Sequence, residues 1–66
     1  MPDKTYIVRF VKLDSSVEVW EHVKREDAKV HFDLFNEDDK DIYSEIDLIE
    51  RDWLKNEDVV LEVKRF

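Results

Sequence analysis

The sequence lacks cysteine and glycine altogether, and it has one proline and one methionine in 66 residues. Without cysteine the chain can form neither a disulfide nor a thiolate zinc site, which are common supports of small folds. Without glycine it cannot form the phosphate-binding loop, the dinucleotide fingerprint, the KH loop or a regular EF-hand. Stability must therefore come from side-chain packing or from oligomerisation.

The length predicts a single small domain that spans residues 1–66. A chain of this size buries only about 60% of the surface that its unfolded form exposes. No apolar run is long enough for a membrane span, and the first residues, Met1 to Lys4, lack the apolar core of a signal peptide. We therefore expect a cytoplasmic protein that does not contact membranes.

The net charge of −7 comes from one part of the chain. Residues 36–58 contain ten acidic and three basic side chains, whereas the rest of the chain has eight of each. Like charges repel, so direct binding to nucleic acid or to an anionic membrane is not expected.

The pattern of apolar residues predicts four strands and one helix. Ala28, His31, Phe32 and Phe35 recur with the period of one helix face, and polar clusters separate the β-branched and aromatic runs. The expected strands are 5–13, 17–23, 42–53 and 59–66, with the helix near 25–35. Phe32 is expected at the centre of the helix–sheet contact. Its expected neighbours are Phe10, Val19, Leu48 and Leu61.

These elements predict an α+β fold of ββαββ order, with the helix on one face of a four-stranded sheet. The first and last strands are apolar on both faces, which is typical of central strands. This favours the strand order 2-1-4-3, with strands 1 and 4 parallel in the middle. That topology resembles the β-grasp arrangement of the immunoglobulin-binding protein G domains; fold alone implies no function.

The C-terminal half has a second resemblance. Residues 46–50 (IDLIE), Trp53 and residues 60–62 (VLE) form a pattern that resembles short uncharacterised proteins of Gram-positive bacteria and their mobile elements. That group has no established activity, so the resemblance implies no site residues.

Catalysis and cofactor binding find little support in the sequence. No nucleophile signature surrounds any serine or histidine, and we expect neither an enzyme nor a cofactor. Asp27 and His31 share a helix face, and His22 could approach them to form a zinc site. The simpler interpretation places His31 at the border of the core and His22 on the outside of a strand. The acidic run at 38–41 is typical of solvated surface.

The aromatic residue Trp20 is the most informative candidate for binding. It alternates with Val17 and Val19, so if the valines face the core, Trp20 points away from the helix. One helix covers only one face of such a sheet, so the other face is open to a partner. The expected partner-binding residues are Trp20, Ile7, Val11, Val60, Glu45 and Asp47.

The sequence does not identify an activity, but it favours three functions in order. The first is a non-enzymatic protein-interaction module that binds another protein, or a second copy of itself, through the open face of its sheet. The second is an acidic inhibitor that mimics nucleic acid and occupies a basic groove on a DNA- or RNA-binding protein. The third is a small metal-binding protein.

Overall fold

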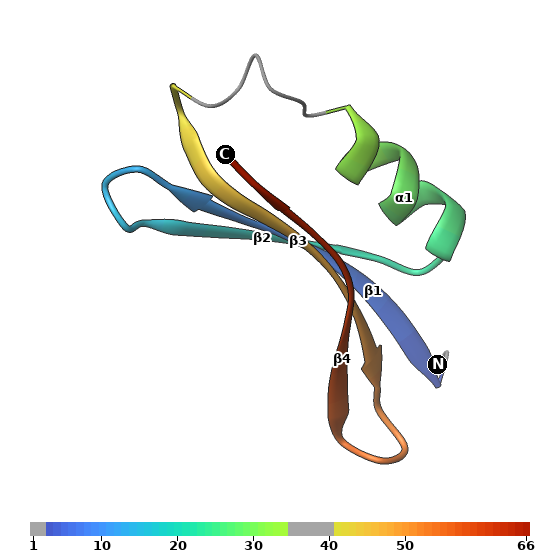
Figure 1. The fold of residues 1–66 in the computed structure, drawn as a ribbon. Helices are drawn as coiled ribbons and strands as arrows, with labels where there is room; N and C mark the ends of the chain where they lie inside the picture. Colours follow the sequence, from blue (N-terminus) through green and yellow to red (C-terminus); the bar gives the residue numbers. More distant parts are fainter. Residues whose placement is uncertain (1–2, 35–40) are drawn as a thin grey trace.

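The computed structural model describes residues 3–34 and 41–66, which form one sheet and one helix (Figure 1). The elements in chain order are β1 (Lys4–Lys12), β2 (Val17–His22), α1 (Arg25–Asp33), β3 (Tyr43–Asp52) and β4 (Glu57–Arg65). The helix lies on one side of the strongly twisted sheet. The predicted α+β class is confirmed. In the described part of the chain, no helix has the length and apolar character needed to cross a membrane.

The strand order is β2-β1-β3-β4, and every neighbouring pair is antiparallel. The predicted order 2-1-4-3, with a parallel pair in the middle, is wrong. The reason is that residues 46–49 of β3 are all buried, so both faces of this strand need cover. A strand of this kind belongs between two others. Strand β4 is mostly exposed and lies at the edge.

The two hairpin turns adopt left-handed backbone conformations without glycine. Ser15 and Asn56 have φ angles of 73° and 53°. At the first turn the Ser16 N–H donates to Asp14 Oδ1 at 2.9 Å. At the second turn, Asp52 Oδ1 accepts the backbone N–H groups of Leu54 and Lys55 at 3.0 and 3.1 Å. The short acidic and amide side chains thus replace glycine in these turns.

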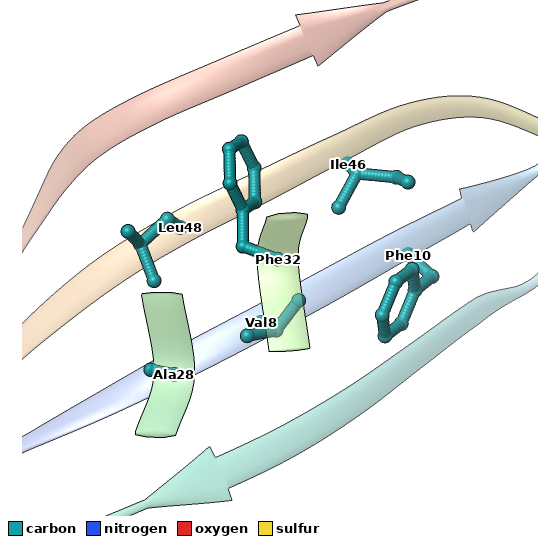
Figure 2. Packing of buried hydrophobic residues seen from close by; sticks show 6 residues of the cluster. All are labelled: Val8, Phe10, Ala28, Phe32, Ile46 and Leu48. Carbon is teal, nitrogen blue, oxygen red and sulfur yellow. The ribbon is translucent and has the colours of Figure 1, made fainter. Parts of the chain in front are cut away.

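The core lies between α1 and the central strands (Figure 2). Its buried members are Val8, Phe10, Ala28, Phe32, Ile46 and Leu48. The predicted contacts of Phe32 with Phe10 and Leu48 agree with this cluster, and Leu61 packs against it while partly buried. The prediction for Val19 is wrong because this residue pairs with Arg9, whose side chain points away from the helix.

Candidate protein-binding face

The face of the sheet opposite α1 is the candidate site. Directly paired residues of antiparallel strands share a face, so the register assigns each side chain to one side. We call this side the open face. Its residues are Thr5, Ile7, Arg9 and Val11 of β1; Val17, Val19 and Glu21 of β2; Glu45, Asp47, Ile49 and Arg51 of β3; and Asp58, Val60, Val63 and Arg65 of β4.

Valines on the two edge strands form the exposed apolar part of the open face. Val17 and Val19 of β2, and Val60 and Val63 of β4, each leave about half of their surface accessible. Between them Ile7 and Ile49 face each other across β1 and β3, and both are buried. Helix α1 packs on β1, β2 and β3 from the other side, so it leaves these valines uncovered.

An ion pair lies at the centre of the open face. Arg9 Nε donates to Asp47 Oδ2 at 2.8 Å across the β1–β3 pair. The Asp47 side chain is 1% exposed, whereas that of Arg9 is 41% exposed. Burial raises the pKa of Asp47, although the Arg9 hydrogen bond opposes this shift. Within the described residues Asp47 Oδ1 has no hydrogen-bond partner, so the carboxylate depends on Arg9.

The other charges of the open face are largely paired as well. Arg51 Nε lies 3.0 Å from Asp58 Oδ1, and Arg65 Nε lies 3.0 Å from Glu45 Oε1. The hydrogen bond from Arg65 lowers the pKa of Glu45. With Glu21, the face carries three basic and four acidic side chains, so it is close to neutral. Most of the excess negative charge of the chain therefore lies elsewhere.

A tryptophan contacts one corner of the open face. Trp53 follows β3, and its Nε1 donates to Thr5 Oγ1 at 2.9 Å. Thr5 Oγ1 in turn donates to Glu21 Oε2 at 2.9 Å. The guanidinium of Arg51 lies 5.3 Å from the Trp53 ring centroid. The chain of hydrogen bonds links the residue after β3 through β1 to β2 and holds the half-exposed indole at this corner.

The structure places five of the six predicted binding residues on the open face. Val60 is exposed there, Val11 and Glu45 are partly covered, and Ile7 and Asp47 are buried. A partner could therefore reach Val60 directly, whereas Ile7 and Asp47 belong to the layer beneath.

The predicted orientation of Trp20 is wrong. Trp20 pairs with Val8 of the core face, and its ring centroid is 5.9 Å from that of His31 on α1. The valines that flank it in sequence point to the open face instead. Because β2 is an edge strand, both of its faces are partly exposed, and Trp20 remains 56% exposed on the helix side.

Sequence reasoning missed the exposed valines Val17, Val19 and Val63, the tryptophan Trp53 and the role of Arg9. A signal for the last was present. Arg9 interrupts the apolar run of the first strand, and Asp47 interrupts that of the third. Single opposite charges inside two apolar strands favour pairing between those strands.

The two histidines meet on the helix side of the sheet. His22 Nε2 lies 2.9 Å from His31 Nδ1, and the His31 ring also contacts Phe10 at a centroid distance of 5.3 Å. The two rings offer two nitrogen ligands. Among residues 3–34 and 41–66, no group of three or more His, Cys, Asp or Glu side chains could hold a metal ion. Asp38 and Asp39 of the acidic run lie outside the described residues.

The pKa of His31 predicts a loss of stability in mild acid. Burial, together with the nearby His22, lowers this pKa below its ordinary value of 6.5. Below pH 6.5 the unfolded chain therefore binds a proton that the folded chain resists, and the free energy of unfolding falls as the pH decreases. We expect a lower thermal midpoint at pH 5.5 than at pH 7.5. His31→Gln should reduce this difference, and an equal difference in the variant would contradict the assignment.

Comparison with family models, with curated proteins and with solved structures found no match to this chain.

Proposed function

We propose that this protein is a non-enzymatic interaction module whose open face binds another protein. The observation that supports this most directly is the set of half-exposed valines on both edge strands, on the face that α1 does not cover. Apolar patches of this kind usually mark contacts between proteins. The partner should present an apolar and nearly neutral surface, because the charges of the open face already pair with each other.

The mimicry of nucleic acid has less support. A mimic must offer its carboxylates to a basic groove. In the described part of residues 36–58, Glu45, Asp47 and Asp58 are bound by arginines, and Glu50 lies 3.2 Å from Lys4 Nζ. Binding through these groups would first break intramolecular ion pairs. We therefore favour a contact through the valines.

Two lysine substitutions test this function. Val19→Lys places a charge on the open face, whereas Val30→Lys places the same charge on the exposed side of α1; the two valines are 57% and 62% exposed. We expect Val19→Lys to weaken partner binding at least tenfold, since an ammonium cannot enter an apolar contact. Val30→Lys should bind as the unchanged protein does.

The measurement uses the unchanged protein as bait in host extract, and the recovered protein is then purified and titrated against both variants by calorimetry. Equal affinities for both variants would contradict binding through the open face. Salt distinguishes the two functions: an apolar contact should change little between low and high salt, whereas a nucleic-acid mimic should lose affinity steeply.

A further inference from the structure

Strand β4 exposes one edge of its backbone. It ends the strand order, so within the described residues it has a strand neighbour on one side only. The N–H of Phe66 donates to the Ser44 carbonyl at 3.1 Å, which points residue 66 inward. The backbone N–H and C=O groups of successive residues in an antiparallel strand point to alternate sides. Those of Val63 and Arg65 therefore point outward, that is, away from β3 and towards the free edge.

The first half of β4 also directs part of its backbone away from β3. Trp53 donates its N–H to the Asp3 carbonyl at 2.8 Å, so the odd-numbered residues of this part of β3 face β1. Their partners on β4, Asp58 and Val60, therefore direct their backbone groups outward. The register shift at Leu48/Ile49 places the extra residue, Leu61, between the two halves. All four outward-directed residues of β4 carry their side chains on the open face.

The charges of β4 are arranged to complement a second copy of the same strand. It begins with Glu57 and Asp58 and ends with Lys64 and Arg65, with valines between. Reversing the strand direction brings the acidic end beside the basic end. We propose that two copies of this chain associate through antiparallel pairing of their β4 edges, which joins the two sheets into one of eight strands.

One register satisfies the backbone and the side chains together. With Asp58 opposite Arg65 of the second copy, Val60 lies opposite its Val63, and symmetry repeats both pairs. The backbone groups of all these residues point outward, so each pair can exchange two hydrogen bonds, for about eight in total. Their side chains share the open face. Moving the strands by one pair places Asp58 opposite Val63 and loses the ion pairs.

Other features of the fold are compatible with this pairing. Helix α1 contacts β4 on the core face, where Lys64 Nζ donates to the Phe32 carbonyl at 2.9 Å, whereas Asp58, Val60, Val63 and Arg65 carry their side chains on the open face. Glu62, near the two-fold axis, is bound by Lys29 of its own chain, which offsets the repulsion between the two copies of this carboxylate. Asp58 and Arg65 are paired with Arg51 and Glu45 of their own chain, but their side chains are 50% and 78% exposed, so each can also contact the facing charge of the second copy without breaking its own pair. The opposite edge, β2, has six residues with the acids Glu18 and Glu21 and no lysine or arginine.

The pairing would also enlarge the open face. Val60 and Val63 of one copy lie directly beside Val63 and Val60 of the other in this register, so four valines form one apolar strip across the axis. The dimer does not depend on the proposed protein-binding function. It would nevertheless provide a longer surface for that function.

Proline at the edge tests the backbone pairing. Val63→Pro removes an outward N–H, and edge strands tolerate proline where the N–H faces solvent. Sedimentation equilibrium should show a dimer for the unchanged chain and for the control Val63→Ala, and at least tenfold weaker association for Val63→Pro. Circular dichroism checks that the sheet persists. A monomeric unchanged chain at several hundred micromolar would overturn the proposal.

Charge reversal tests the register even if Val63→Pro fails to fold. Arg65→Glu alone places two acids opposite each other at each end, and Asp58→Lys alone places two bases there. Each variant should be monomeric, and an equimolar mixture should form a heterodimer in which every end pair is again of opposite sign. Native mass spectrometry distinguishes the species. Homodimers of either variant as strong as those of the unchanged chain would overturn the pairing.

Val19→Lys separates this inference from the proposed function. Val19 lies on β2, at the other edge of the sheet, so the substitution should leave the β4 dimer intact while it weakens partner binding. A dimer lost in Val19→Lys and retained in Val63→Pro would assign self-association to the open face and would overturn β4 pairing.

Discussion

Replacement of Phe32 by alanine is expected to leave most of the protein unfolded at 25 °C. The Phe32 side chain is 2% exposed and packs among Val8, Ile46 and Leu48 in the core cluster (Figure 2). Truncation of a buried phenylalanine typically costs ~3–5 kcal/mol. A domain of this size without disulfides has a total stability of about 3–5 kcal/mol. The cost of Phe32→Ala is therefore about as large as the free energy of unfolding of the whole domain.

Urea titration followed by circular dichroism measures this effect, and α1 offers a matched control. Val30→Ala changes the same helix two residues earlier, at a side chain that is mostly exposed. Because alanine favours helix and little burial is lost, this variant should stay within about 0.5 kcal/mol of the unchanged protein. A Phe32→Ala variant with a urea midpoint close to that of the control would show that the core does not depend on this ring.

The helix and its buried face could be predicted because their signal is local. Ala28 and Phe32 are one turn apart, and the period of 3.6 residues alone places them on one side. Short polar turns likewise identify the two hairpins. The position of β3 beside β1 depends on contacts between residues about 40 positions apart, such as Arg9 with Asp47. Apolar content alone could not decide which strand of the second hairpin is central.

The orientation of β2 shows a second limit. Its alternation separated Trp20 from Val17 and Val19 correctly, but it could not say which set faces the helix. In an edge strand both sets remain half exposed, so burial does not distinguish them. The register of the hairpin with β1 decides the matter, and that register depends on the geometry of the turn at residues 13–16. The sequence therefore predicted that one face of the sheet is uncovered, but it assigned Trp20 to that face when this residue lies on the helix side.

Removal of the Arg9 charge should destabilise the protein by about 2–3 kcal/mol at pH 7. Arg9→Met keeps most of the apolar stem and removes the guanidinium, which leaves the buried Asp47 carboxylate without its partner. Breaking a fully buried pair costs roughly 3–5 kcal/mol, and the 41% exposure of Arg9 reduces this figure. Arg65→Ala is the matched control at concentrations where the chain is monomeric, since it breaks the exposed pair with Glu45 and should cost less than about 0.5 kcal/mol.

The pH dependence gives the Arg9 variant a signature that a general packing defect lacks. Burial raises the pKa of Asp47, the neighbouring Glu45 raises it further, and the substitution removes Arg9, which opposes the shift. Above the ordinary value of 3.8, the folded variant then holds a proton that the unfolded chain releases, so its stability rises as the pH falls from 7 towards 4. The difference in the free energy of unfolding between this variant and the unchanged protein should therefore be smaller at pH 4.5 than at pH 7.

Addition of Asp47→Val to Arg9→Met should recover most of the lost stability at pH 7, because apolar residues can replace a buried ion pair. Denaturant titrations of both variants at the two pH values measure these differences, and a deficit that is independent of pH and persists in the double variant would refute the role of the Arg9–Asp47 pair.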